Sequence, residues 1–307
     1  MNPSSLLRRA LCASAIATLA ACGAVQLPNA APLRSGTEGH PVAGTLIYAA
    51  GDIASYVFTF PKGRLVGTIA SPAFGACSDQ SGNVYFTQVR DIAEYRHGGT
   101  KPIATLNVPG TAYSCSVDPA SGNLAAVVFC IKHCGEEIFV FSAGGKRPHR
   151  YAIPMLTSLL YCTYDAGGNL FVDGYDGTRF GLAELASGST SFSSITLKYS
   201  IKYPAQIQWD GKDLAIETRE NPVVLRVAVS GSSARVVGRV HLNGIGGRAT
   251  QSWIADGRIA VPTGPNRRRA TEIMFWKYPA GGNPTNLFNG FIGSGHAMID
   301  AVTFSSS

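Results

Sequence analysis

The chain has 307 residues, of which 45% are hydrophobic and 15% charged, so it can bury a sizeable core in one large domain or two ordinary ones. Its net charge of +7 is spread along the sequence, and the one dense basic run is Arg267 to Arg269. Scattered positive charge favours solubility and weak attraction to anionic surfaces, whereas nucleic-acid-binding proteins carry a basic stripe or a known module. We therefore expect no nucleic-acid partner.

The N-terminus has the pattern of a bacterial export signal. An Arg8-Arg9 pair precedes a short apolar stretch, which is too short to span a bilayer as a mature helix. The stretch ends in LAAC at Cys22, which resembles the lipobox, the motif whose cysteine is lipidated and becomes the new N-terminus. We predict a lipoprotein signal peptide over residues 1–21 and lipid attachment at Cys22. Ordinary cleavage nearby, giving a soluble exported protein, is the alternative.

The residues after this motif indicate the cellular location of the protein and the limits of its folded domain. Cys22 is followed by Gly23, whereas an Asp there resembles an inner-membrane retention signal in Gram-negative bacteria, so Gly23 favours the outer membrane. Residues 22–43 carry Pro, Gly and small residues without periodicity, which is typical of a flexible tether. We expect the folded domain over residues 44–307, with the membrane as a partner through the lipid on Cys22.

One unit recurs along the rest of the chain. It opens with an apolar strand that ends in Asp, followed by a tight turn and three further strands. The clearest copies read CSDQSGN from Cys77, CSVDPASGN from Cys115 and CTYDAGGN from Cys162. Four-stranded units of about 40–50 residues are typical of propeller blades. The anchor aspartates of the successive copies are Asp79, Asp118, Asp165, Asp210, Asp256 and Asp300.

The two ends of the chain complete each other. Residues 45–49, 56–60 and 65–69 are predicted as the second, third and fourth strands of a blade that lacks a first strand. The chain after Asp300 has room for one strand only. We therefore predict an all-β fold, a six-bladed β-propeller closed by a blade shared between the N- and C-terminal segments. Closure removes exposed sheet edges, and we expect a monomer.

Over residues 44–304 the chain resembles six-bladed propellers of the NHL and gluconolactonase/regucalcin kind, through its Asp-x-x-Gly-Asn and Gly-Gly turns. The gluconolactonase resemblance implies a divalent metal in the central channel, held by a Glu, two Asn and an Asp. The inner-strand positions of this chain carry other residues, and we expect no cofactor and no metal. Those residues are Cys77, Cys115, Cys162, Gln208, Trp253 and His296.

The aspartates of the repeat allow two interpretations. They could form an acidic ring, but we expect each carboxylate to accept hydrogen bonds from backbone N–H groups of its own turn. The segment from Asp173 to Gly177 is faintly similar to a cation-binding loop. We interpret it as a hairpin loop bent by its glycines.

Five cysteines remain after the lipidated one. Disulfides persist in exported proteins, so Cys130 and Cys134, which flank a predicted hairpin tip, are expected to bond to each other. A metal site that uses His133 is the alternative. Bridging two blades requires Cα atoms within about 7 Å, which spacing cannot show, and small cysteines pack well in a core. We therefore expect Cys77, Cys115 and Cys162 to be buried thiols.

In propellers of this kind, ligands usually meet the face built from the loops between second and third strands and the loops between blades. Arginines and aromatic residues on that face supply forked donors and flat rings for a polar, anionic or sugar-like ligand. Ordinary solvated loops are the alternative, and we expect the run at Arg267 to be solvated. The candidate ligand-binding residues are Phe74, Tyr113, Asp173, Tyr175, Arg179, Tyr203, Arg248 and His296.

The sequence contains no Gly-x-Ser-x-Gly elbow, phosphate-binding loop or zinc-protease motif, and its histidines lack metal spacing. We therefore predict no catalytic residues. The expected function is that of a non-catalytic binding or scaffold module of the cell envelope, for a polar ligand or a protein partner. The alternative is a propeller-type hydrolase or lyase, lactonase-like and either metal-dependent or metal-free.

Overall fold

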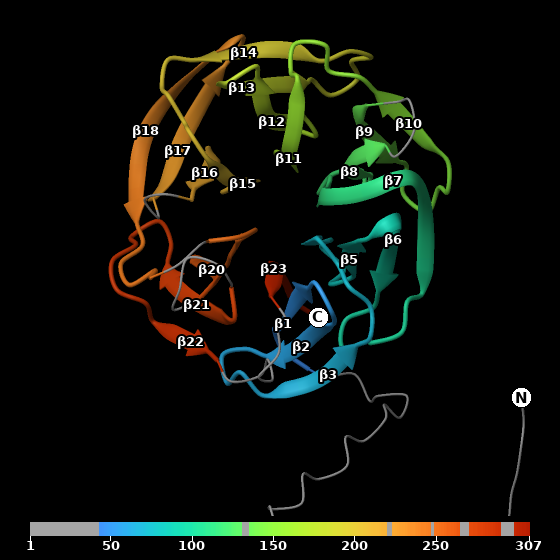
Figure 1. The fold of residues 1–307 in the computed structure, drawn as a ribbon, viewed down its shortest axis with the longest axis vertical. Helices are drawn as coiled ribbons and strands as arrows, with labels where there is room; N and C mark the ends of the chain where they lie inside the picture. The colour runs from blue at the N-terminus through green and yellow to red at the C-terminus, as the bar shows by residue number, and fades with distance from the viewer. Residues whose placement is uncertain (1–42, 131–134, 220–222, 247–248, 265–269, 290–297) are drawn as a thin grey trace, which may run out of the picture. The chain divides into compact units, whose positions relative to one another are not determined.

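The chain folds into antiparallel strands packed around a central axis (Figure 1). This computed structural model describes residues 43–130, 135–219, 223–246, 249–264, 270–289 and 298–307, which all belong to one compact unit. The described residues form 23 strands and no helix, as the short β-branched and aromatic runs predict. The predictions for Cys22, Cys134, Arg248, Arg267 and His296 lie outside the described residues.

The first sheet joins the two ends of the domain. Strand β23 pairs antiparallel with β1, with Leu46 opposite Ser305, and the predicted pairing of the ends is confirmed. Figure 1 shows β23 near the axis and β3 at the perimeter. The order across the sheet is β23 (Ile299–Ser305), β1 (Leu46–Gly51), β2 (Ser55–Thr59) and β3 (Leu65–Ile69).

The second sheet contains seven strands because one of them is shared. The first part of β7 pairs with β6 and the second part with β8, so this strand lies at the perimeter first and near the axis afterwards. Pro109 lies near its middle, close to the point where pairing with β6 gives way to pairing with β8. The strands are β4 (Gly75–Ser78), β5 (Val84–Thr87), β6 (Val89–Tyr95), β7 (Ala104–Val117), β8 (Leu124–Cys130), β9 (Glu136–Phe141) and β10 (Pro148–Tyr151).

Eight strands form the third sheet, in two antiparallel groups whose outer strands β14 and β18 pair in parallel. The prediction of a loop from Asp173 to Gly177 is wrong. Strand β12 continues through residue 176, and only a short turn follows it. The strands are β11 (Ser158–Tyr164), β12 (Leu170–Asp176), β13 (Arg179–Leu185), β14 (Ser193–Leu197), β15 (Pro204–Trp209), β16 (Leu214–Thr218), β17 (Val223–Ser230) and β18 (Ser233–His241).

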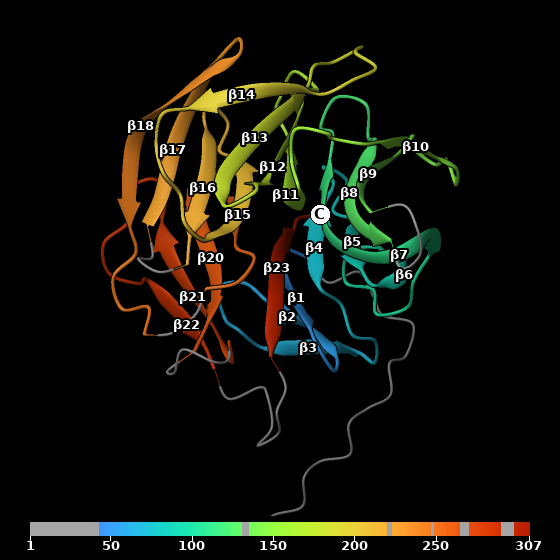
Figure 2. The ribbon, with the colours of Figure 1, turned by 45° about the horizontal axis from the view of Figure 1, so that its top comes forward.

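The fourth sheet closes the ring of sheets onto the first. Phenylalanine side chains from three distant segments meet at this junction. The ring centroid of Phe60 lies 5.3 Å from that of Phe304 and 5.2 Å from that of Phe275. On the other side of the first sheet, β23 lies beside β4 (Figure 2). The strands of the fourth sheet are β19 (Trp253–Ala255), β20 (Arg258–Thr263), β21 (Glu272–Lys277) and β22 (Asn286–Phe288).

The aspartate turns follow the prediction at four of the six positions. The carboxylates of Asp79, Asp118, Asp165 and Asp210 each accept hydrogen bonds from backbone N–H groups of their own turns, at 2.8–3.0 Å. The assignment of Asp300 as an anchor is wrong. This residue lies near the start of β23, at the end of the strand opposite to the turns.

The cysteines differ from the prediction in one respect. Cys77 on β4 and Cys115 on β7 form a disulfide with their Cα atoms 5.7 Å apart, so the expectation of buried thiols is wrong for both. The reason is that the two innermost strands lie side by side at this level, which repeat spacing does not reveal. Cys162 is a buried thiol as predicted, and burial raises its pKa to about 12. Cys130 is disulfide-bonded, while its predicted partner lies outside the described residues.

Candidate functional site

The strands nearest the axis share an irregularity near one end. In each of four of them, one extra residue interrupts the pairing with the next strand outward: Tyr113 in β7, one residue of the Leu160–Tyr161 step in β11, Ala205 in β15 and Asp300 in β23. A bulge leaves a residue unpaired and turns its side chain away from the regular alternation. Three of these bulges bring a side chain into one pocket on the axis.

This axial pocket is small, at about 50 Å³. A volume of this size holds a water molecule or one polar group of a larger molecule, but not a whole ligand. Gln251 is one of its lining residues, and its Nε2 donates to the carbonyl oxygens of Phe74 at 2.9 Å and Tyr113 at 3.1 Å. The lining residues are Phe74, Tyr113, Tyr161, Arg219, Thr250, Gln251 and Asp300.

Arg219 is the one basic side chain among the described residues that line the axial pocket. Its Nη2 donates to Tyr161 Oη at 2.7 Å, and Tyr161 Oη lies 3.3 Å from Tyr113 Oη. The Nε of Arg219 is buried and has no hydrogen-bond partner in the described part of the chain. A guanidinium donor without an acceptor is available to a ligand oxygen.

Asp173 lies directly behind Tyr161. The bulge in β11 frees the Tyr161 amide from the ladder, and Asp173 Oδ1 accepts a hydrogen bond from it at 2.9 Å. The Oδ2 atom is buried without a partner among the described residues. Burial raises the pKa of Asp173 to about 8, against the lowering effects of the Tyr161 amide and the nearby Arg219 charge. The buried carboxyl group is therefore mostly protonated at neutral pH.

Glu217 occupies the matching place on β16, beside the bulge in β15. It is buried, and neither carboxyl oxygen is in good hydrogen-bond geometry with a described residue, although the Ser252 hydroxyl lies near enough to act on the carboxyl group. Burial raises its pKa to about 7, although the nearby Ser252 hydroxyl and Arg219 charge lower it. Gln206 is paired with Glu217 across the two strands, and its buried Oε1 likewise has no partner among these residues. Unpaired buried groups of this kind are costly, and each calls for a partner such as a water or a bound molecule.

The axial residues do not fit the divalent cation that the gluconolactonase resemblance implies. Burial raises the pKa of both carboxyl groups, which disfavours their ionised forms, and the positive charge of Arg219 acts on both of them. Divalent cations need several ionised or carbonyl oxygens around one point. Within the described residues, no group of three or more His, Cys, Asp or Glu side chains is placed to hold a metal ion.

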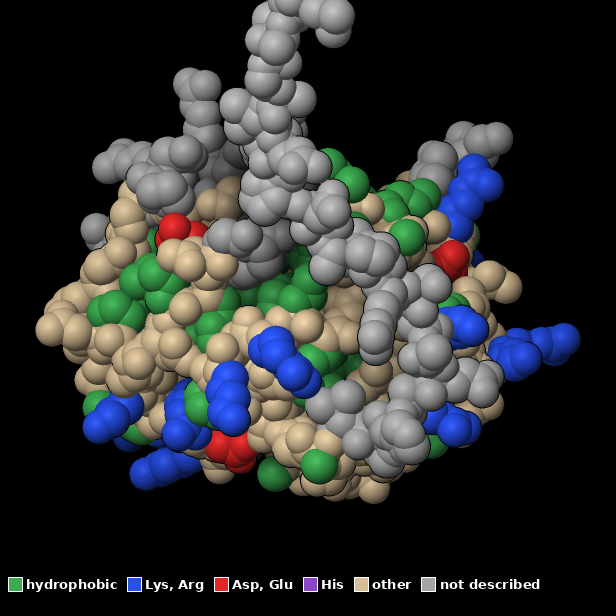
Figure 3. Space-filling view, turned by 90° about the horizontal axis from the view of Figure 1, so that it is seen from below, with side chains coloured by type: hydrophobic (Ala, Val, Ile, Leu, Met, Phe, Trp, Pro, Cys, Tyr) green, Lys and Arg blue, Asp and Glu red, His purple; other side chains and the backbone are tan. Residues whose placement is uncertain are grey.

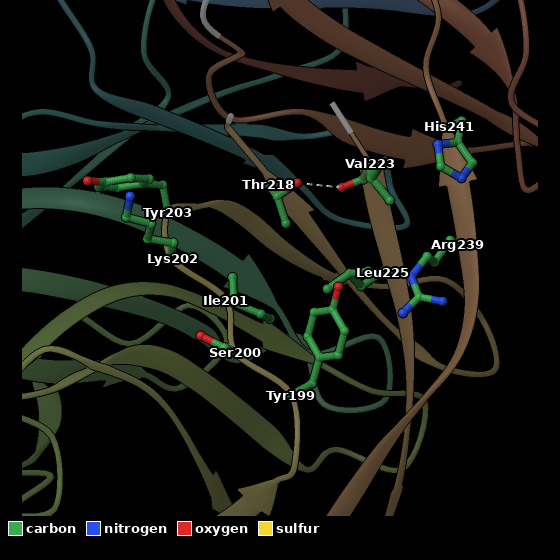
Figure 4. Close-up of a pocket in the computed structure, with 10 residues that line it drawn as sticks. All are labelled: Tyr199, Ser200, Ile201, Lys202, Tyr203, Thr218, Val223, Leu225, Arg239 and His241. Carbon is green, nitrogen blue, oxygen red and sulfur yellow. Dashed lines mark hydrogen bonds between the residues drawn. The ribbon is translucent and has the colours of Figure 1, made fainter. Parts of the chain in front are cut away.

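A second pocket, the lateral pocket, lies between the segment that joins β14 to β15 and strands β16 to β18 (Figure 4). Its volume is about 510 Å³, which is within the usual range for ligand sites. Arg239 Cζ lies 5.4 Å from the ring centroid of Tyr199, and Lys202 Nζ lies 5.2 Å from that of Tyr203. The lining residues are Tyr199, Ser200, Ile201, Lys202, Tyr203, Thr218, Val223, Leu225, Arg239 and His241.

A third pocket, of about 380 Å³, lies at the turns that carry the anchor aspartates. Trp209 and Trp253 contribute to its lining, and the buried Nε1 of Trp209 has no acceptor among the described residues. The carboxylates of Asp79 and Asp118, which also line it, already accept hydrogen bonds within their own turns. This pocket is therefore less open to a charged ligand than the other two.

The structure separates the predicted ligand-binding residues into three groups. Phe74 and Tyr113 line the axial pocket, with Asp173 behind it, and Tyr203 lines the lateral pocket. The hydroxyl of Tyr175 donates to the carbonyl oxygen of Lys202 at 2.9 Å, so Tyr175 supports the lateral pocket from outside. Arg179 is exposed at the start of β13 and lines none of the three pockets.

Four residues of the axial site are not among the predicted ligand-binding residues: Tyr161, Glu217, Arg219 and Gln251. Two of them, Glu217 and Arg219, lie in a segment expected as a loop on the binding face. Tyr161 and Tyr113 both line the pocket. Yet Tyr161 directly precedes Cys162, whereas Tyr113 lies two positions before Cys115. The bulges change the register between neighbouring strands and hide this equivalence. Arg219 could be identified from the sequence, because it directly follows the second strand of its blade, at the end where the ligand-binding loops are expected.

The described Lys and Arg side chains lie in small separate groups on the side of the molecule shown in Figure 3, with few acidic ones between them. In the described part of the chain, no helix is long and apolar enough to cross a membrane.

Comparisons with known proteins identify the fold. No model of a known protein family matches the chain, and no curated protein matches it significantly. A chain of the nidogen/laminin complex aligns with a TM-score of 0.66 and 13% identity, over 85% of this chain and 98% of its own. The Cps50 (Swd1) β-propeller domain of Myceliophteria thermophila aligns with a TM-score of 0.54 and 10% identity, over 83% and 88%.

The fold is a β-propeller. Streptogramin B lyase also aligns with this propeller, with a TM-score of 0.50 and 17% identity, over 72% of this chain and 70% of its own. At these identities the likeness concerns the fold alone, and fold does not determine function.

Proposed function

We propose that this propeller is an exported, lipid-anchored binding module of the cell envelope that recognises a polar group of a ligand or protein partner in the axial pocket. The observation that carries the proposal is an unpaired buried donor on a residue that lines that pocket. Arg219 Nε has no partner in the described ranges. Burying such a donor without a partner costs about 1–3 kcal/mol, a cost that binding can offset.

The chemistry of the pocket indicates what it would recognise. The free donor of Arg219 and the tyrosine hydroxyls favour an oxygen acceptor, such as a carboxylate or carbonyl group. The small volume admits one such group, so the rest of the ligand would lie outside, against the loops of this face. That arrangement matches a protein side chain or the end of a larger polar molecule.

The number of blades, the family resemblance and the membrane location are part of the same proposal. The groups β4–β7, β7–β10, β11–β14, β15–β18 and β19–β22, with the sheet of β23 and β1–β3, support six four-stranded blades. The kinship with NHL and gluconolactonase-like propellers rests on the turn motifs. The signal peptide and lipidation rest on the motif at Cys22.

One observation favours an enzyme as the second candidate. The pKa values of Glu217, about 7, and of Asp173, about 8, are those of residues that can donate and accept protons at neutral pH. A hydrolase or lyase of the propeller type would use such groups. Against it, neither carboxyl group is among the residues that line the pocket, which separates them from a bound molecule.

The experiment is a thermal-shift screen of small carboxylates, amino acids and sugars against the wild-type protein, repeated with Arg219→Ala and Arg219→Lys. We expect hits whose stabilisation is lost in Arg219→Ala, while Arg179→Ala, an exposed arginine outside the pockets, retains it. Hits that depend instead on Trp209, in the pocket at the aspartate turns, would place binding on the other face and contradict the proposal. Turnover of a lactone or ester that is abolished in Glu217→Gln would favour the enzyme.

A further inference from the structure

We propose that the lateral pocket is a second binding site, for an anionic saccharide such as a uronic-acid oligosaccharide, independent of the axial pocket. The first observation is the exposure of its aromatic rings. Tyr199 and Tyr203 are 38% and 43% exposed, and both line the same pocket, so two partly exposed rings are presented together. Flat exposed rings are the surfaces on which pyranose rings stack.

The second observation is the charge of the pocket. Lys202 and Arg239 line it, together with His241, and no carboxylate is among its described lining residues. The ion pairs within the described ranges involve Arg150 and Arg226, so neither Lys202 nor Arg239 is neutralised by a salt bridge there. These cations are therefore free to bind an anionic group, and the guanidinium fork of Arg239 suits a carboxylate.

Ring and charge are placed together. Each tyrosine has one cation over it, at 5.4 Å for Arg239 and Tyr199 and at 5.2 Å for Lys202 and Tyr203. Figure 4 shows the two pairs on opposite sides of the pocket. A sugar acid presents the complementary pattern, because its carboxylate is attached directly to the ring that stacks.

The pocket is held in shape before any ligand arrives. Ile201 and Leu225, at its base, are 3% and 2% exposed and belong to one hydrophobic cluster. The carbonyl oxygen of Lys202 accepts a hydrogen bond from the Tyr175 hydroxyl, and that of Tyr203 accepts one from the Arg219 amide, both at 2.9 Å. Binding therefore needs little ordering of the backbone, which favours affinity.

The test is isothermal titration calorimetry with trigalacturonic acid at low salt, with maltotriose as the neutral sugar and inorganic phosphate as the anion without a ring. We expect trigalacturonate to bind the wild-type protein at least tenfold more tightly than either. Tyr199→Ala and Arg239→Ala should each weaken it at least tenfold. Arg235→Ala, an exposed arginine on the same strand, is the matched control and should change it less than twofold.

If Tyr199→Ala does not fold, Tyr203→Ala tests the contribution of the second aromatic ring in the same way and should likewise weaken the binding. Arg219→Ala should leave this binding within twofold of wild type, because only the backbone of that residue supports the lateral pocket. Failure of trigalacturonate to bind, binding as tight for phosphate or maltotriose, or binding unchanged in Arg239→Ala overturns the proposal. Loss of binding in Arg219→Ala alone would assign the probe to the axial pocket and overturn it equally.

Discussion

The backbone amide of Arg219 donates a hydrogen bond to the carbonyl oxygen of Tyr203 at 2.9 Å, and this bond ties the axial pocket to the lateral one. Arg219 directs its side chain toward the axis, while Tyr203 lines the pocket on the other side of the same backbone contact. The two segments are the link into β15 and the end of β16. Both proposed sites therefore depend on how these neighbouring strands terminate.

Replacing Glu217 with Gln should change how stability depends on pH. Its pKa rises from an ordinary value of 4.5 to about 7 in the folded protein, so the folded state retains a proton that the unfolded chain has lost. The free energy of unfolding of the wild type should therefore fall as the pH rises through this window. Glu217→Gln has no such group, and we expect it to gain about 3 kcal/mol relative to wild type between pH 4 and 8.

Urea unfolding at several pH values measures this difference. Asp173→Asn should behave in the same direction, with the change extending to about pH 8. Parallel pH profiles for the wild type and Glu217→Gln would mean that the carboxyl group is not desolvated in solution.

Phe304→Ala should be strongly destabilising. The side chain is 5% exposed and packs against Phe60 from near the N-terminus and Phe275 from β21, so it holds three segments together. Truncating a buried phenylalanine costs about 3–5 kcal/mol. Leu287→Ala, at a position 42% exposed on β22, is the control and should cost less than about 1 kcal/mol. Equal losses in the two variants would show that β23 does not close the domain.

The features that could be predicted from the sequence are those that short motifs specify through neighbouring residues. The Asp79 and Asp165 turns are encoded by neighbours that the aspartate itself contacts, and the pairing of β1 with β23 follows from a blade that is incomplete at both ends. The bulges at Tyr113 and Tyr161 have no such signature, because a bulge is a property of the pairing between two strands and not of one local motif. The repeat pattern therefore misassigns Asp300 as an anchor, although this residue lines the axial pocket.

The lipidation prediction can be tested apart from the structure. Cys22→Ser removes the thiol that the lipobox-like motif supplies, so we expect unprocessed precursor or protein released from the membrane fraction. Metabolic labelling with an alkynyl palmitate, followed by membrane fractionation, gives the readout. Cys12→Ser, within the signal peptide, is the matched control and should label as the wild type does. Labelling that persists in Cys22→Ser would exclude this residue as the attachment site.

Removing the Cys77–Cys115 disulfide should destabilise the propeller. The bond joins β4 to β7 across 38 residues of sequence, so it restricts the unfolded chain over nearly one repeat. A loop of this length corresponds to about 4 kcal/mol in the chain-entropy estimate, with measured values typically 2–4 kcal/mol. We expect the Cys77→Ala/Cys115→Ala double variant to lose that much free energy of unfolding under oxidising conditions.

Dithiothreitol provides the control for this loss. It should bring the wild type toward the double variant. The comparison holds only if the second bonded cysteine, Cys130, is removed from both proteins first, since its disulfide is reduced as well. If the oxidised wild type and the double variant unfold at the same urea concentration, the Cys77–Cys115 bond between β4 and β7 contributes nothing to stability.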